Sequence, residues 1–244
     1  MNLLEEYISV KGNIIIMLSG LSGSNKSVIA KIMSEDFGIE LINLNDYIVN
    51  VTMVEFNGVE IEDWDNIEIY DWDKLNSDIS LVKNYIICGD MFPEDKITFV
   101  PDFHIHITMT KAELYDKRVE MIEKDKEKYK KLLAIGDELK KYLNKITYGH
   151  YVKNKEKSKI DLWVTYSEKD EMYNKIFDYI IEKMKEYLTE HYAKEKREFD
   201  YIKKKDKTKF TFSSSSSENS GDHEEGVIVM GKFHDYIDEL RHVL

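Results

Sequence analysis

The sequence has 244 residues, of which 42% are hydrophobic and 34% are charged, and it contains only two prolines. This composition excludes a collagen, a short disulfide-braced scaffold and a wholly disordered chain. The formal net charge of −12 argues against a general affinity for nucleic acid or for an anionic lipid surface.

The sequence shows no sign of a membrane or secreted protein. Its longest strongly apolar run, residues 14–18, is far shorter than the roughly 20 residues of a membrane helix. The first twelve residues lack the basic-then-apolar pattern of a secretion signal. Cys88 is the only cysteine, which excludes an internal disulfide and suits a reducing compartment. We therefore expect an intracellular, cytoplasmic protein without membrane contact.

Short apolar runs alternate with longer helical patterns over the first 190 residues, the order that builds a parallel sheet covered by helices. Residues 14–18 predict a continuous buried strand, and residues 27–37 predict the helix that follows it. Four further strands are expected at residues 40–44, 85–88, 103–108 and 160–164.

A β-hairpin is expected next to the second strand. Asn57-Gly58, between residues 51–56 and 59–61, is a strong signal for a tight hairpin turn. An α/β enzyme can carry a substrate flap at this position, and a surface hairpin without a ligand role is the alternative.

Two longer helical segments follow. Residues 111–143 are helical and highly charged, with an interruption near Gly136. From residue 168 to about residue 205 the pattern predicts one long helix, whose apolar stripe fades after His191.

Charges divide the end of the chain into blocks. Residues 191–212 hold eight Lys or Arg and four acids, a balance of +4, and predict a basic helical extension beyond a domain of residues 1–190. A solvated helix end is the default interpretation of that run, with RNA or an acidic protein as alternative partners. Residues 213–226 contain five consecutive serines and carry −4, the composition of a flexible linker. Residues 227–244 predict a short strand and an amphipathic helix that docks on the body or on a protein partner.

The most informative motif is Gly20-Leu21-Ser22-Gly23-Ser24-Asn25-Lys26-Ser27, which follows the first strand and opens the first helix. A phosphate-binding loop of the form G-x-x-x-x-G-K-[ST] uses backbone N–H groups and a helix N-terminus to hold phosphates, a lysine to bridge the β and γ phosphates, and a hydroxyl to bind magnesium. Asn25 replaces the second glycine of this form. Asparagine tolerates left-handed backbone angles, but it adds bulk where the backbone approaches phosphate. We expect ATP to bind at Gly20, Ser22, Gly23, Ser24, Asn25, Lys26 and Ser27, and a loop that has lost its nucleotide is the alternative.

Two aspartates are expected at the same edge of the sheet. Asp46 follows the second strand and Asp90 follows the third, and open α/β sheets bind ligands at the carboxyl ends of their strands. A small-molecule kinase needs one carboxylate near the acceptor hydroxyl and another near Mg2+. We expect Asp46 and Asp90 to share these roles, with Ser27 as a third metal-binding residue, and loop-capping aspartates are the alternative. Arg118, on the helix after the fourth strand, is expected to stabilise the transferred charge together with Lys26.

The chain resembles the uridine kinase family, including its nicotinamide riboside kinase relatives, from about residue 13 to residue 166. Asn45-Asp46-Tyr47 resembles the family's Asp-Asp-Phe/Tyr acceptor motif, and residues 64–75 resemble its Asp-His-Pro segment. Cys88-Gly89 falls where the family has Glu-Gly, and residues 159–164 are similar to its late Lys-x-Ala-Asp-Ile-Ile strand. The resemblance implies a three-layer α/β/α P-loop fold with five parallel strands. It also implies that Asp46 is the base on a sugar 5′-hydroxyl, with Lys26 and Ser27 holding ATP and magnesium.

These patterns lead to one main hypothesis and two alternatives. We expect ATP- and Mg2+-dependent phosphoryl transfer to a hydroxyl of a nucleoside-like small molecule. A catalytically silent descendant, kept as a structural or interaction module, is the first alternative and is favoured by Asn25, by the small number of arginines and by the long charge-blocked tail. Only three of the 35 basic residues are arginine, and Lys, Ile and Asn are common, which indicates an AT-rich genome; for the silent module this genome would be virus-like. A kinase of nucleic-acid ends is the second alternative, and the acidic body disfavours it.

Two other groups of side chains have structural interpretations. His104 and His106 alternate on a predicted strand and therefore face the same side. Without a third ligand at suitable spacing, we expect them to be buried core histidines rather than metal ligands. The aromatic side chains of Trp64, Tyr70 and Trp72 are expected to pack against the sheet, and stacking on a base is the alternative.

Overall fold

The computed structural model describes residues 2–211, which divide between two compact units, Met1–His191 and Tyr192–Leu244. The linker expected at residues 213–226 and the strand and helix expected at residues 227–244 lie outside the described residues. The first unit contains the whole sheet and the phosphate-loop sequence.

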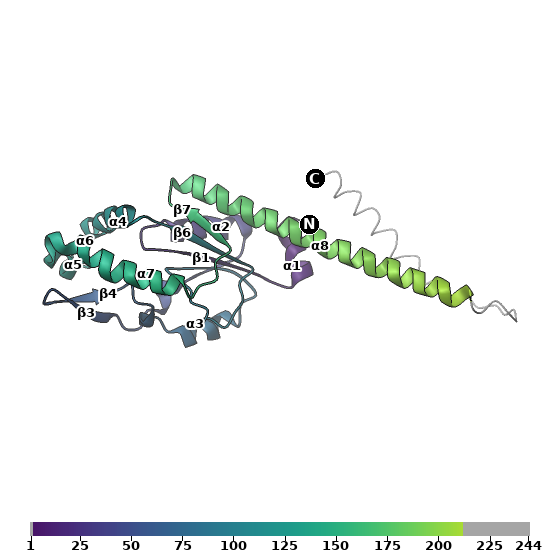
Figure 1. The fold of residues 1–244 in the computed structure, drawn as a ribbon, viewed down its shortest axis with the longest axis horizontal. Helices are drawn as coiled ribbons and strands as arrows, with labels where there is room; N and C mark the ends of the chain where they lie inside the picture. Colours follow the sequence, from purple (N-terminus) through teal and green to yellow (C-terminus); the bar gives the residue numbers. More distant parts are fainter. Residues whose placement is uncertain (1, 212–244) are drawn as a thin grey trace. The chain divides into compact units, whose positions relative to one another are not determined.

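β1 (Ile14–Gly20) lies in the middle of a five-stranded sheet with the order β2-β5-β1-β6-β7. All four pairings between neighbouring strands are parallel, so the carboxyl ends of all five strands lie at one edge (Figure 1). The expected five-stranded parallel sheet is confirmed, and each strand begins and ends within two residues of its predicted range. The other four strands are β2 (Glu40–Asn43), β5 (Asn84–Gly89), β6 (Phe103–Thr108) and β7 (Leu162–Thr165).

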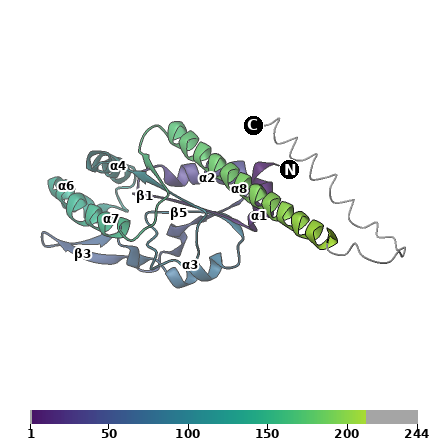
Figure 2. The ribbon, with the colours of Figure 1, turned by 45° about the vertical axis from the view of Figure 1, so that its right-hand side comes forward.

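Helices cover both faces of this sheet, which gives the three layers implied by the sequence (Figures 1 and 2). β1 is buried along its whole length, as expected for an apolar run between two other strands. Its Ile15 and Met17 side chains join a cluster that includes Trp72 and Leu75 of α3 (Trp72–Ile79). The alternate residues of β1 point to the opposite face, where α2 (Lys26–Phe37) lies (Figure 2).

α8 (Lys169–Thr211) is the long helix that the sequence predicts, and it continues six residues further than expected. In the first unit its buried side chains recur every four residues, at Met172, Ile176, Ile180, Met184 and Leu188. In the second unit residues 193–202 are all exposed. No helix in the described part of the chain is long and apolar enough to cross a membrane.

The region between β6 and β7 is more broken than the sequence predicts. α4 (Lys111–Lys124) ends at Asp125, α5 (Lys130–Ala134) ends at Ile135, and Gly136 has a φ of 49°. Short turns lead through α6 (Leu139–Tyr142) into α7 (Tyr148–Lys155), which lies beyond the predicted helical segment.

The hairpin of β3 (Thr52–Phe56) and β4 (Val59–Asp63) has the expected turn, with positive φ at both Asn57 and Gly58. Its buried Phe56 and Ile61 form a separate core with side chains of the helical region, among them Tyr142. The hairpin is therefore packed against the broken helical region and does not lie free on the surface.

α1 (Leu3–Lys11) has no counterpart among the sequence-based predictions. Its first turn is closed by a capping box, in which the Asn2 side chain accepts from the Glu5 backbone N–H and the Glu5 carboxylate accepts from the Asn2 backbone N–H. Asp102 fixes the helix to the sheet, because it accepts hydrogen bonds from Tyr7 at 3.2 Å and from Lys11 at 2.7 Å.

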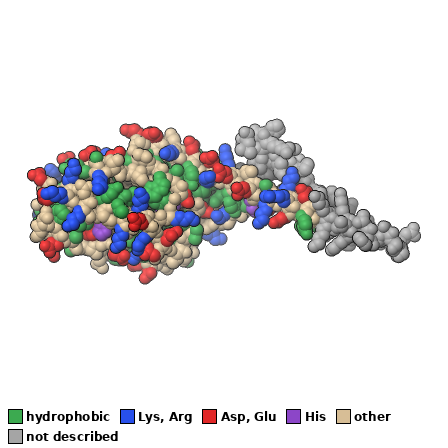
Figure 3. Space-filling view, in the orientation of Figure 1, with side chains coloured by type: hydrophobic (Ala, Val, Ile, Leu, Met, Phe, Trp, Pro, Cys, Tyr) green, Lys and Arg blue, Asp and Glu red, His purple; other side chains and the backbone are tan. Residues whose placement is uncertain are grey.

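The visible face of the first unit carries basic and acidic side chains that are interspersed rather than grouped by sign (Figure 3). This mixture gives no continuous basic surface on that face for a polyanion.

Candidate phosphate-binding site

The loop between β1 and α2 has the backbone geometry that its sequence predicts. Gly23 has a φ of 95°, and Asn25 has a φ of 65° with a ψ of 8°, so both lie in the left-handed region. Asparagine is among the few non-glycine residues that adopt this conformation routinely. The Asn25 side chain makes no capping hydrogen bond to α2. The loop thus keeps a left-handed backbone at the position where the consensus has glycine.

Lys26 and Asp90 form an ion pair at the carboxyl edge of the sheet. The Lys26 Nζ lies 2.7 Å from Asp90 Oδ1, and the two side chains are only 8% and 17% exposed. The backbone N–H of Gly20 also donates to the Asp90 carbonyl at 3.1 Å. The residue after β5 is therefore joined to both ends of the loop, which places two of the predicted site residues together.

Ser27 and Asp46, like this ion pair, lie near Cys88. The Cys88 thiol is 4.0 Å from Ser27 Oγ. Burial raises the pKa of this thiol, the Ser27 hydrogen bond and the Lys26 charge lower it, and the Asp90 and Asp46 carboxylates raise it further. All four side chains thus lie near Cys88, and both Ser27 and Asp46 are exposed to solvent. The predicted loop residues and both predicted aspartates share one edge of the sheet.

Arg118 is not free at this edge but forms a buried ion pair. Its Nη2 lies 2.7 Å from Asp65 Oδ1, and the two side chains are 3% and 7% exposed. The Thr147 hydroxyl donates to the other Asp65 oxygen at 2.7 Å. Arg118 Nε is buried without a hydrogen-bond partner. Burial tends to lower the pKa of Arg118, but the Asp65 and Asp90 carboxylates outweigh burial and hold the pKa above its usual value.

Sequence reasoning did not select Asp65 as a site residue, although residues 64–75 contain it. A second carboxylate from the end of β4, Asp63, pairs with His150 of α7 at 2.7 Å. The hydrogen bond to Asp63 raises the pKa of His150 despite the opposing effect of burial. Asp63 Oδ1 is buried without a hydrogen-bond partner. The end of the hairpin is therefore bound to the helical region by two carboxylates.

α4 lies directly against the phosphate loop. A Cβ built on Gly23 would lie 2.8 Å from Lys117 Cβ, so only glycine fits there. The Lys117 ammonium group itself pairs with Glu120 at 2.9 Å.

His104 and His106 form a core hydrogen-bond network with Ser19 of β1, as expected for structural histidines. Ser19 Oγ lies 2.8 Å from both His104 Nε2 and His106 Nδ1. His104 Nδ1 bonds to the Lys159 carbonyl, which only accepts; because burial lowers the pKa of His104 to about 4, the ring is neutral and its Nε2 accepts from Ser19. Ser19 then accepts from His106 Nδ1. The described residues contain no group of three His, Cys, Asp or Glu side chains that could hold a metal ion.

The other aromatic and cavity features lie away from the loop. Tyr70 and Trp72 are buried in the core between α3 and the sheet, as expected, whereas Trp64 is half-buried outside that cluster and donates its indole N–H to Glu62. A hollow of about 470 Å³ lies under the crossover from β5 to β6, between Phe92 and Phe99.

The parallel sheet, its central phosphate strand and the left-handed loop entering α2 define an α/β P-loop kinase-like fold, with α8 as a C-terminal helix. No protein-family model and no curated protein matches the sequence. Among solved structures, an uncharacterized protein from Eubacterium ventriosum is 18% identical, with a TM-score of 0.37 over 69% of this chain and 98% of its own. A structure described as a possible uridine kinase from Bacillus stearothermophilus is 13% identical, with a TM-score of 0.38 over 66% of this chain and 98% of its own. The class rests on the strand order and the loop.

Proposed function

We propose that this protein transfers the γ-phosphoryl group of ATP, in a magnesium-dependent reaction, to a hydroxyl of a nucleoside-like small molecule. The observation that carries the proposal is the 2.7 Å ion pair between Lys26 and Asp90 at the end of β1 and β5. A buried ammonium at the mouth of a loop with left-handed turns suits a polyphosphate. The resemblance of Asn45-Asp46-Tyr47 to an acceptor motif supports the nucleoside-like substrate.

In this proposal Lys26 and the loop N–H groups bind the phosphates. Lys26 exchanges its carboxylate partner for phosphate oxygens when ATP binds, which frees the Asp90 carboxylate. Ser27 and Asp90 would hold Mg2+ together with phosphate oxygens, and the ion would supply positive charge that neutralises the phosphates. Because too few protein ligands lie together to hold the metal alone, we expect metal binding to depend on the nucleotide.

Asp46 takes the role of the base. Its carboxylate accepts the proton of the acceptor hydroxyl as that oxygen bonds to the γ-phosphorus, and the bond from this phosphorus to the bridging oxygen breaks to release ADP. We assign Arg118 a share in stabilising the transferred group, which requires its guanidinium, paired with Asp65 in the free protein, to act together with that carboxylate. We assign this chemistry to a domain of residues 1–190 and regard residues 191–212 as an added basic extension.

ATP binding is the first test. ATP with Mg2+ is expected to raise the melting temperature of the wild-type chain, because a ligand that binds only the folded state stabilises it. Lys26→Met should abolish this rise. Lys31→Met is the matched control, since Lys31 lies exposed on α2 in a surface pair with Glu35. No rise in the wild-type chain at saturating ATP would refute the kinase and leave the silent module.

Turnover is the second test. Asp46→Asn should retain the ATP-induced rise in melting temperature and lose phosphorylation across a panel of nucleosides, because the amide cannot accept the proton as the carboxylate does. Retained turnover would remove Asp46 from the role of base. Faster phosphorylation of RNA ends than of free nucleosides would favour the nucleic-acid kinase.

A further inference from the structure

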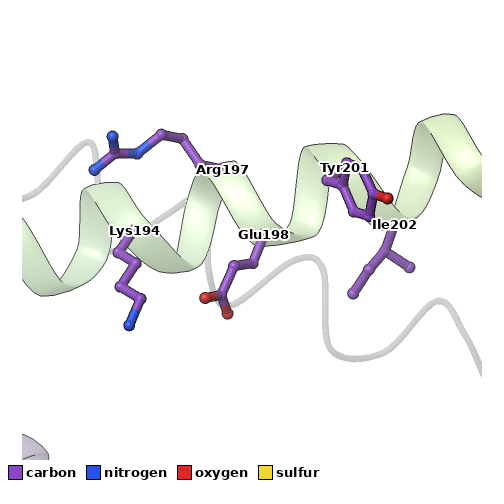
Figure 4. A pocket seen from close by; sticks show the side chains of 5 residues that line it. All are labelled: Lys194, Arg197, Glu198, Tyr201 and Ile202. Atoms are coloured by element: carbon purple, nitrogen blue, oxygen red, sulfur yellow. The ribbon is translucent and has the colours of Figure 1, made fainter.

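The distal part of α8, in the second unit, presents one face with an unusual composition. Lys194, Arg197, Glu198, Tyr201 and Ile202 lie at positions i, i+3, i+4, i+7 and i+8, which share one side of a helix. They line a shallow hollow of about 430 Å³ (Figure 4). We call this surface the distal α8 face.

The apolar members of the distal α8 face are strongly exposed. Tyr201 is 67% exposed and Ile202 is 56% exposed. The Lys194 and Arg197 stems add methylene groups beside them. A helix end that is merely solvated does not need large apolar side chains such as Tyr201 and Ile202 beside its charged residues. This face is therefore suited to binding another polypeptide.

The net charges of the candidate partners favour the chain's own C-terminal part as the polypeptide that binds this face. Residues 191–212 carry +4, and the acidic stretch of residues 213–226 carries −4. A second copy of α8 would bring +4 against +4, which opposes side-by-side pairing of this segment. Glu198, in the middle of the face, opposes a nucleic acid. In the chain's own C-terminal part, the −4 of residues 213–226 is followed directly by apolar residues: Val227, Ile228, Val229, Met230, Phe233, Tyr236, Ile237 and Leu240.

The length of the acidic stretch allows this contact. Residues 212–226 can span roughly 50 Å when extended, at about 3.3–3.6 Å per residue. The distance back along α8 from Thr211 to Glu198 is about 20 Å, at 1.5 Å per residue. A tether of this length gives an effective concentration in the millimolar range, so a weak contact suffices to keep the face occupied.

We propose that the distal α8 face is the docking surface for residues 227–240 of the same chain, and that the acidic stretch between them strengthens the contact. The contact is intramolecular and independent of ATP binding. It covers the exposed Tyr201 and Ile202.

Hydrogen exchange on the full-length chain tests this docking. Ile237→Asp should speed amide exchange of residues 193–202 by about ten-fold, as expected when a contact at millimolar effective concentration is lost. Ile202→Asp should reciprocally speed exchange of residues 227–240. Leu81→Asp, at a position 85% exposed in the first unit, is the control and should change neither. Unchanged exchange of β1 shows that each variant is folded.

Two outcomes would overturn the proposal. Exchange of residues 193–202 that is the same in the wild-type chain and in Ile237→Asp would show that the segment does not cover the face. Protection that disappears on ten-fold dilution of the wild-type chain would assign the face to a second copy. Protection that survives dilution but weakens at high salt supports the tethered, charge-assisted contact.

Discussion

Replacing Arg118 with methionine tests the energetics of the buried ion pair. Methionine keeps most of the apolar stem and removes the guanidinium, so the Asp65 carboxylate, 7% exposed, loses its charged partner. Removing one member of a buried pair costs about 3–5 kcal/mol. The hydrogen bond from Thr147 to Asp65 remains and offsets about 1 kcal/mol of this cost. We expect Arg118→Met to lower the free energy of unfolding by about 2–4 kcal/mol.

Urea and thermal unfolding measure the effect. For a chain of this size, that loss corresponds to a decrease in melting temperature of roughly 5–15 °C. The double variant Arg118→Met/Asp65→Asn removes the unpaired charge and should recover much of the stability, with a coupling free energy of about 2 kcal/mol. Lys141→Met, which breaks an exposed pair with Glu138, is the control and should change stability far less.

Two results would refute this reasoning. One is a destabilisation by Arg118→Met no larger than that of the surface control. The other is a double-mutant cycle with no coupling, since it would mean that Asp65 is not held by the guanidinium.

Three further predictions concern the hairpin and the loop. The hydrogen bond to Asp63 raises the pKa of His150, so the pair stabilises the fold fully below the ordinary histidine pKa of about 6.5 and loses this effect as pH rises through the raised value. His150→Gln should therefore destabilise the protein more at pH 6 than at pH 9 in urea titrations, and a difference that is constant with pH would contradict the assignment. Asn25→Ala should melt below Asn25→Gly by the equivalent of about 1–2 kcal/mol, because alanine tolerates a left-handed backbone poorly, and equal melting temperatures would argue against the φ of 65°. Ile61→Ala, at a fully buried site in the hairpin core, should cost about 2–5 kcal/mol in urea unfolding, whereas a loss under 1 kcal/mol would show that the hairpin does not pack as described.

The sheet and the loop could be predicted because their signals are local. The uninterrupted run from Ile14 to Leu18 marks a strand buried on both faces, and Asn57-Gly58 marks a tight turn. Asp46 and Asp90 could be placed near the loop because parallel strands share one carboxyl edge, whatever the details of packing. The position of Arg118 could not be predicted. Its partner Asp65 lies 53 residues earlier, and only the packing of the hairpin against the helical region brings the two together.

Other features were missed because their signals are weak or depend on tertiary contacts. α1 has a capping box in its sequence, Asn2 with Glu5, but it buries few side chains, chiefly Glu6 and Tyr7, so no apolar stripe marks it. The breaks between α4 and α7 follow the fit of short segments around the hairpin core rather than any proline. Lys26 illustrates a third case. The motif identifies the lysine but does not reveal that its ammonium group is paired with the Asp90 carboxylate in the free protein.

Because Gly23 and Lys117 fit closely together, α4 connects the phosphate loop to the hairpin. With no room for even one extra carbon between loop and helix, the loop cannot be displaced toward α4 without pushing it. Arg118 is the next residue on that helix and forms an ion pair with Asp65, just after the hairpin. A displacement of the loop in that direction would therefore press on Lys117, whose neighbour Arg118 is tied to the hairpin end through Asp65.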